Sequence, residues 1–159
     1  MTIKVGDRLP DATLVKVTHE GPEQVETADY FAGRRVALFA VPGAFTPTCS
    51  AQHLPGFLAQ ADAIRAKGVD EIACTAVNDA FVMKAWRQVN DATAITMLAD
   101  GNADFAKAIG LTLDGSKFGM GTRSQRYTML VHDGVVEQLF VEAPGEFKVS
   151  SAEHLLSVL

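Results

Sequence analysis

A single cysteine lies where an apolar strand turns into a helix, and this arrangement constrains the fold more than any other part of the chain. Residues 35–41 form a continuous apolar run, which predicts a strand buried on both faces of a sheet. A Pro-Gly turn follows, and Thr46 as N-cap with Pro47 at the first helical position would place Cys49 in the first helical turn. Thr48 is an alternative cap. Unpaired backbone N–H groups and the helix dipole favour a thiolate there, so the sequence predicts a nucleophile.

The surroundings of Cys49 decide between a reactive thiol and an inert packing residue. Most free cysteines are buried and serve only as small apolar side chains. Turn and cap residues precede Cys49, whereas the polar residues Ser50, Gln52 and His53 follow it. This pattern is typical of the edge of a fold, so we expect an accessible, reactive thiol.

The rest of the chain alternates strands and helices. Residues 12–17 and 23–27 predict an N-terminal β-hairpin across Gly21-Pro22, and residues 111–122 predict a glycine-rich surface loop. Further strands are predicted at 71–77, 94–98, 124–131 and 135–141, and helices at 49–67 with an interruption at Pro55, 78–89, 103–109 and 150–159. The alternation predicts a mostly parallel sheet with helices on both faces and the chemistry at the carboxyl ends of the strands.

The composition limits the partners and the compartment. A length of 159 residues predicts one domain, 1–159, with a core that needs neither disulfides nor metal. The net charge of −5 and the dispersed Lys and Arg residues argue against nucleic acid or a membrane and favour small soluble substrates. The first residues do not resemble a targeting segment, and two cysteines suit a reducing compartment, so we expect a cytoplasmic protein.

The motif Pro42-x-x-x-Thr46-x-x-Cys49 resembles the peroxidatic motif of peroxiredoxins. The type II, atypical five-like subfamily is similar also at residues 53–57, 68–74, 77–86 and 126–127, so the resemblance covers nearly the whole chain. It implies a thioredoxin-like α/β fold, with a central mixed sheet flanked by helices and extended by the N-terminal hairpin. It also implies a thiol peroxidase for hydrogen peroxide and small alkyl hydroperoxides that needs no metal, haem or flavin cofactor.

The resemblance implies roles for four residues. Cys49 attacks the peroxide and becomes a sulfenic acid, and Thr46 places its hydroxyl beside the sulfur and the peroxide. Pro42 shields the thiolate from water, and Arg126 stabilises the thiolate and polarises the peroxide. Without the resemblance, Arg126 is only a solvated charge at the start of a strand, and Arg123 competes with it on charge alone.

Three other functions are compatible with parts of the pattern. His53 lies four residues after Cys49, as a Cys–His hydrolase could require, but no Asn or Asp is apparent to orient the imidazole. A metal site on Cys49, His53 and Cys74 lacks paired ligand spacing. A non-catalytic thiol redox sensor or thioredoxin-like binding module is the third, and peroxide consumption distinguishes it from an enzyme.

The second cysteine bears on how the enzyme is recycled. Cys74 alternates with Ile72 and Ala76 on a predicted interior strand, so buried packing is the preferred interpretation. Plant-like relatives hold a cysteine at this place, and animal relatives also use one near the C-terminus, where this chain has Ser150-Ser151. Because this chain lacks that C-terminal cysteine and Cys74 is expected to be sheltered, we expect reduction by glutathione and a separate glutaredoxin. The alternative is reduction by thioredoxin through a Cys49–Cys74 disulfide.

Apolar side chains on two loops predict a homodimer. Ala44 and Phe45 lie in the turn before Cys49, and Phe118 and Met120 lie between glycines. Exposed apolar loop residues usually mark a partner surface. Because type II relatives dimerise through this end of the domain, we expect the interface beside Cys49.

Overall fold

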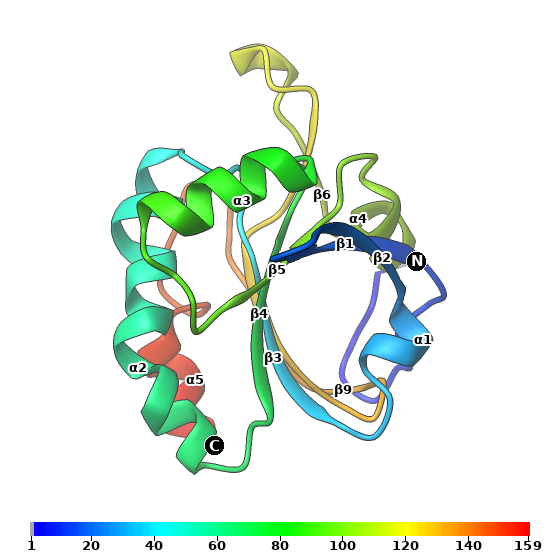
Figure 1. Cartoon of the computed structure of the whole chain (residues 1–159), viewed down its shortest axis with the longest axis vertical. Coiled ribbons are helices and arrows are strands. Elements are labelled where there is room, and N and C mark those ends of the chain that lie inside the picture. The colour runs from blue at the N-terminus through cyan, green and yellow to red at the C-terminus, as the bar shows by residue number, and fades with distance from the viewer. Residues whose placement is uncertain (1) are drawn as a thin grey trace.

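The computed structural model describes residues 2–159, which form a seven-stranded sheet between two layers of helices (Figure 1). The strands of this sheet are β1 (Thr13–Thr18), β2 (Gly21–Glu26), β3 (Arg35–Ala40), β4 (Glu71–Ala76), β5 (Thr96–Ala99), β8 (Tyr127–His132) and β9 (Val135–Val141). The helices are α1 (Thr27–Tyr30), α2 (Leu54–Ala66), α3 (Ala80–Val89), α4 (Asp104–Ile109) and α5 (Ala152–Val158). Within the described residues, none of these helices is long and apolar enough to cross a membrane.

The sheet is mixed, with the order β2-β1-β5-β4-β3-β8-β9. β4 runs parallel to both β3 and β5, whereas β1, β2, β8 and β9 pair in antiparallel fashion. The prediction of a mostly parallel sheet is therefore wrong for the outer strands, because β1 with β2 and β8 with β9 form hairpins, and each hairpin pairs antiparallel with a central strand. The central mixed sheet that the resemblance implied is confirmed.

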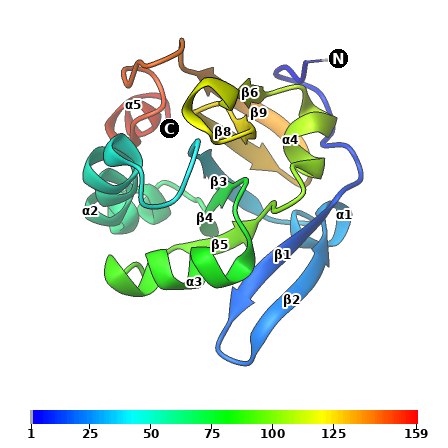
Figure 2. The ribbon, with the colours of Figure 1, turned by 90° about the horizontal axis from the view of Figure 1, so that it is seen from above.

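Alternate residues of β3 serve two hydrophobic cores, one on each face of the sheet. Ala37 and Phe39 belong to the core under α2, α3 and α5, whereas Val36 and Leu38 belong to the core that includes residues of α1 and α4. Figure 2 shows these two groups of helices on opposite sides of the sheet. Burial on both faces explains why this strand is apolar throughout.

The N-terminal hairpin is confirmed, but its turn lies elsewhere than predicted. The two strands turn at residues 19–20, and Pro22 pairs with Val17 inside the ladder of β1 and β2. β2 is the edge strand of the sheet, where a residue without an N–H group is tolerated. Pro22 therefore belongs to a strand and not to the turn.

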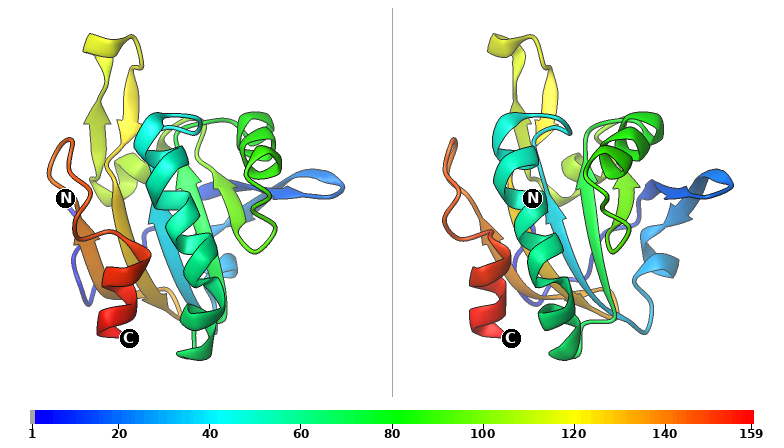
Figure 3. Two further views of the ribbon diagram at one scale, coloured as in Figure 1. Left: turned by 90° about the vertical axis from the view of Figure 1, so that its left-hand side faces the viewer. Right: turned by 60° about the vertical axis from the view of Figure 1, so that its left-hand side comes forward.

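The predicted loop at 111–122 is instead a projecting antiparallel ribbon. β6 (Thr112–Asp114) pairs with β7 (Thr122–Ser124), and a short 3-10 helix at Ser116–Phe118 lies near the tip. Figure 3 shows this ribbon standing out from the end of the sheet at which α2 begins. Strands of three residues are too short to give a readable alternation of apolar and polar residues.

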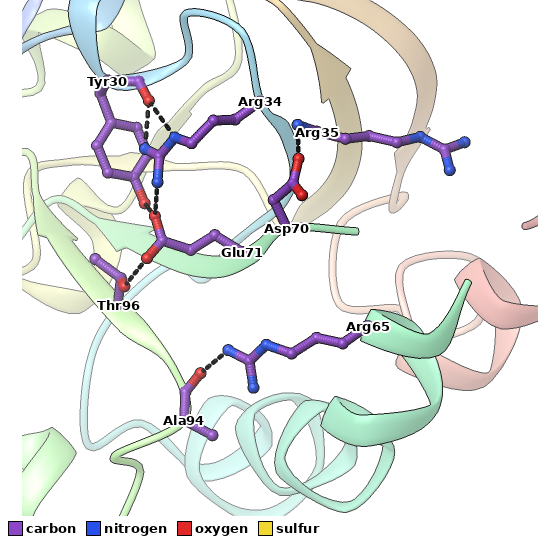
Figure 4. A network of polar contacts seen from close by, with 8 residues as sticks. All are labelled: Tyr30, Arg34, Arg35, Arg65, Asp70, Glu71, Ala94 and Thr96. Carbon is purple, nitrogen blue, oxygen red and sulfur yellow. Dashed lines mark hydrogen bonds and ion pairs between the residues drawn. The ribbon is translucent and has the colours of Figure 1, made fainter. Parts of the chain in front are cut away.

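A polar network fixes the α1 region to the amino ends of β4 and β5, away from Cys49 (Figure 4). The Tyr30 hydroxyl and Arg34 Nη1, the latter at 2.8 Å, both donate to Glu71 Oε2, and Thr96 donates to Oε1 at 2.9 Å. Burial alone would raise the pKa of Glu71, but the hydrogen bonds and the Arg34 charge outweigh it and lower this pKa below its usual value. The network therefore holds a charged carboxylate with a structural role.

Candidate active site

The turn after β3 brings Cys49 into a helix as the sequence predicts. Helical backbone begins at Pro47, and the Thr46 carbonyl accepts the Ser50 N–H at 2.9 Å. The Thr46 hydroxyl does not act as the expected cap, because it donates to the Gly43 carbonyl at 2.6 Å. Thr46 thus closes the turn with its hydroxyl and starts the helix with its carbonyl.

Helical backbone runs through Pro55, but the helix changes from a π turn to a regular α-helix just before it. Residues Cys49–His53 form a π-helical turn, in which the Leu54 N–H donates to the carbonyl of Cys49, five residues earlier. Pro55 lacks an N–H group, and in a regular α-helix its ring would clash with the carbonyl four residues before it. The wider π turn absorbs this irregularity, so the interruption that Pro55 predicts appears just before it.

Cys49 is fully buried, which contradicts the accessible setting expected from the sequence. Of the polar residues that follow it, Gln52 is exposed, but Ser50 and His53 make contacts inside the structure. Ser50 Oγ accepts a hydrogen bond from the indole N–H of Trp86 at 3.0 Å, and His53 is fully buried. The polarity of Ser50 and His53 therefore reflects internal hydrogen bonds and not exposure of Cys49.

Arg126 lies against the sulfur of Cys49. Its Nη2 donates to Sγ at 3.1 Å, and its Nη1 lies 3.0 Å from His53 Nδ1. The competing candidate, Arg123, is turned away and donates to the carbonyls of Met120 and Val77. Arg126 is thus the arginine that the fold brings to the thiol, 77 residues further along the chain.

His53 is held as a neutral imidazole. Burial, and then the Arg126 charge, lower its pKa to about 3, although the hydrogen bond with Ser150 opposes this shift. Nε2 lies 2.9 Å from the Ser150 carbonyl, and the rings of Phe39, Phe57 and Phe147 surround the imidazole. Since His53 contacts Arg126 through Nδ1 and Ser150 through Nε2, it is not arranged as a general base for Cys49.

A pocket of about 220 Å³ lies beside this group. Pro42, Thr48 and Arg126 form part of its wall, and the remaining lining residues are Leu113, Gln125 and residues 142–146. Arg126 therefore faces both the pocket and the buried sulfur. A small molecule in the pocket can reach the guanidinium group that contacts Cys49.

Cys74 lies at the centre of β4, with Phe39 as its partner on β3. It is fully buried in the same core as Cys49, and both thiols are free. Burial, and then the proximity of Cys49, raise the pKa of the Cys74 thiol well above its usual value. The predicted burial of Cys74 is confirmed, and this thiol stays protonated in the folded protein.

The site also depends on residues that sequence reasoning did not connect with it. Asn78 accepts the Ala44 N–H at 2.9 Å and so fastens the turn before Cys49. Glu142 binds the segment that carries Ser150, the acceptor for His53. Neither role has a local sequence signal, because Asn78 lies 34 residues after Ala44 and Glu142 reaches His53 only through Ser150, which lies 97 residues after His53. No group of three or more His, Cys, Asp or Glu side chains within residues 2–159 could hold a metal ion.

A buried thiol bound by an arginine, at the start of a helix on a thioredoxin-like mixed sheet, defines the class of thiol-dependent oxidoreductases. Comparison with known proteins identifies the family within this class. The Redoxin family matches residues 4–156. The chain belongs to the Redoxin family and is a peroxiredoxin, a thiol peroxidase.

Three relatives illustrate the match. Chloroplastic peroxiredoxin-2E-2 of Oryza sativa is 51% identical over 99% of this chain and 73% of its own length. Hybrid peroxiredoxin hyPrx5 of Haemophilus influenzae is 40% identical over 100% of this chain and 67% of its own length. Reduced Prx3 of Vibrio vulnificus, solved in complex with hydrogen peroxide, is 55% identical, covers 99% of both chains and has a TM-score of 0.96.

Proposed function

We propose that Cys49 is the peroxidatic residue and that it reduces hydrogen peroxide and small alkyl hydroperoxides. The observation that carries this proposal is the 3.1 Å contact between Arg126 Nη2 and the Cys49 sulfur, beside a pocket of about 220 Å³. A water molecule occupies about 30 Å³ of the liquid, so the pocket has room for a peroxide with a small alkyl group.

The chemistry follows from these positions. The thiolate sulfur attacks the terminal peroxide oxygen, an S–O bond forms and the O–O bond breaks. Cys49 is oxidised to a sulfenic acid, and the leaving oxygen takes a proton and departs as water or an alcohol. Arg126 stabilises the charge that develops on the peroxide oxygens. The Thr46 hydroxyl donates to Gly43, so its oxygen remains an acceptor for the peroxide O–H, and Pro42 restricts water at the pocket wall.

Mass spectrometry of the two cysteines after one equivalent of peroxide tests this assignment. We expect a sulfenic acid at Cys49 and an unmodified Cys74. Oxidation that begins at Cys74, or no reaction at Cys49, would contradict the proposal. We also propose that the protein acts in the cytoplasm, as expected from the sequence.

For recycling, we propose glutathione and a separate glutaredoxin. Glutathione attacks the sulfenic sulfur, releases water and forms a mixed disulfide, which the glutaredoxin thiol then exchanges. The burial and protonation of Cys74 support this route, because a thiol in that state is a poor nucleophile. The alternative is local opening of the turn that carries Cys49, formation of a Cys49–Cys74 disulfide and reduction by thioredoxin.

Replacing Cys74 with Ser separates the two routes. We expect Cys74→Ser to keep full turnover with glutathione plus glutaredoxin, and the oxidised wild type to carry glutathione on Cys49. Turnover is measured with each reductant, and the adduct by mass spectrometry. Cys74→Ala is the matched control, because it removes the thiol without burying a hydroxyl group. Loss of turnover with every reductant in both variants would instead make Cys74 the resolving residue.

We also propose a homodimer, formed through the end of the domain that carries the pocket. Phe45 is 51% exposed and Phe118 is 82% exposed, whereas Ala44 is buried and Met120 is partly buried. Phe45 adopts a left-handed φ of 67°, a conformation that costs about 1–2 kcal/mol for a residue other than glycine. An aromatic side chain kept exposed at such a position supports a partner surface.

Replacing Phe45 with Glu is expected to weaken this dimer at least tenfold, because a charge desolvated at an interface costs more than about 1.4 kcal/mol. Sedimentation velocity over a range of micromolar concentrations measures the change. Val158→Glu, an exposed apolar residue on α5, is the matched control. A wild type that sediments only as a monomer would overturn the proposal.

A further inference from the structure

Arg126 is held at two points, of which only one is the reacting sulfur. Nη2 donates to Cys49, and Nη1 donates to His53 Nδ1 at 3.0 Å. A guanidinium group is planar, so fixing Nη1 also fixes the direction in which Nη2 points. The orientation of Arg126 at the sulfur therefore depends on the acceptor that His53 provides.

Two neighbours dictate which nitrogen of His53 carries the proton. Arg126 can only donate hydrogen bonds, so Nδ1 must present a lone pair. The Ser150 carbonyl can only accept, so Nε2 must carry the hydrogen. The opposite tautomer would place N–H against N–H at one contact and a lone pair against a carbonyl oxygen at the other. The Ser150 carbonyl thus selects the form of His53 that can hold Arg126.

The Ser150 carbonyl is itself fixed in place. Glu142 Oε2 accepts the backbone N–H groups of Lys148, Val149 and Ser150 at 2.8, 2.9 and 2.8 Å, and the Ser150 hydroxyl at 2.7 Å. Thr128 Oγ1 donates to the Ser150 carbonyl at 2.6 Å. Burial would raise the pKa of Glu142, but these hydrogen bonds outweigh it and lower this pKa below its usual value. One buried carboxylate therefore shapes the whole segment from 148 to 150.

We propose that Glu142 is a positioning residue that acts on Arg126 through His53. Its carboxylate sets the direction of the Ser150 carbonyl, and that carbonyl sets the tautomer and orientation of the imidazole. The imidazole then aims the guanidinium group at the sulfur and at the place where a peroxide oxygen gains charge. The inference rests on the proposed roles of Cys49 and Arg126.

The rate of Cys49 oxidation by hydrogen peroxide in Glu142→Gln is the first test. All four hydrogen bonds end on Oε2, and a neutral amide oxygen in its place accepts them more weakly than a carboxylate does, so the segment is held less firmly. Because a displacement of about 1 Å in a reacting geometry can cost about 10²-fold, we expect oxidation to slow by about 10- to 100-fold. Glu153→Gln is the matched control, since Glu153 is an exposed carboxylate on α5 that lies outside the pocket. It should oxidise at the wild-type rate.

The ¹⁵N signals of the His53 ring provide a readout that a purely structural role would not change. The reduced wild type should show a single neutral tautomer with hydrogen on Nε2, and Glu142→Gln a mixture of the two. A wild-type oxidation rate together with unchanged His53 signals in Glu142→Gln would overturn the inference. Failure of the proposed function is distinguishable, because a wild type that is not oxidised at Cys49 would still report the His53 tautomer.

Two further variants apply if Glu142→Gln does not fold. Ser150→Ala removes one hydrogen bond to Glu142 but keeps the backbone carbonyl, so we expect a smaller loss of rate in the same direction. His53→Asn retains an acceptor near the position of Nδ1, so it should oxidise faster than His53→Ala. Equal rates for Ser150→Ala and the wild type, and for the two His53 variants, would overturn the inference.

Discussion

Replacing Cys49 with Ser is expected to reduce peroxide consumption to the uncatalysed rate. A serine hydroxyl is scarcely ionised at neutral pH and cannot form a sulfenic acid, so the substitution removes the reacting atom itself. Consumption is followed with glutathione and glutaredoxin and, separately, with thioredoxin. Turnover retained by Cys49→Ser with either reductant would rule out Cys49 as the peroxidatic residue.

The fold of this variant should persist, although Cys49 is buried and not at the surface as the sequence suggested. Serine is of similar size, and its oxygen can accept the hydrogen bond from Arg126 Nη2. We expect a loss of about 1 kcal/mol in the free energy of unfolding, measured by thermal and denaturant unfolding. Loss of activity with this small change in stability separates chemistry from folding.

Replacing Arg126 with Gln is expected to slow Cys49 oxidation by about 10²–10³-fold, as removal of one donor to a developing oxyanion does in other enzymes. Glutamine lacks both the charge and the fork that reaches Cys49 and His53 together. The rate is compared with that of alkylation by iodoacetamide, which has no oxyanion leaving group. The rate of oxidation by peroxide should fall more than the rate of alkylation by iodoacetamide.

Arg123→Gln is the matched control for the loss of a positive charge. Arg123 holds the Met120 and Val77 carbonyls and does not contact the sulfur, so its replacement should leave the oxidation rate largely unchanged. An unchanged rate in Arg126→Gln would show that Arg126 has only a structural role. If only Arg123→Gln slowed oxidation strongly, Arg123 would be the catalytic arginine.

The sequence was informative about the positions of strands and helices that depend on residues close together in the chain, although it misjudged the Thr46 cap and the burial of Cys49. The apolar run of β3 and the turn leading to Pro47 predicted the position of Cys49. The helix predicted over 78–89 corresponds to α3, where Asp79 Oδ1 accepts the Val82 N–H. The ribbon of β6 and β7 was missed, because its three-residue strands pair with each other and leave little apolar pattern.

The site was predictable only in part. Arg126 could be chosen over Arg123 from the family resemblance but not from charge, because the choice depends on which strand end approaches Cys49. The spacing of His53 correctly placed it near Cys49 but suggested the wrong contact, since its partners are Arg126 and Ser150. Contacts between segments about 100 residues apart leave no periodic signal in a single sequence, so the connection from Glu142 to His53 required the structure.

The hydrogen bond between Trp86 and Ser50 makes the fluorescence of Trp86 sensitive to the turn that carries Cys49. Trp86 is the single tryptophan of the sequence and is fully buried, and its indole N–H donates to the residue immediately after Cys49. Indole emission depends on the polarity and hydrogen bonding around the ring, so a rearrangement of the π turn would change its intensity and wavelength. Intrinsic fluorescence can therefore follow the active-site turn during oxidation and recycling, with no dye and no added residue.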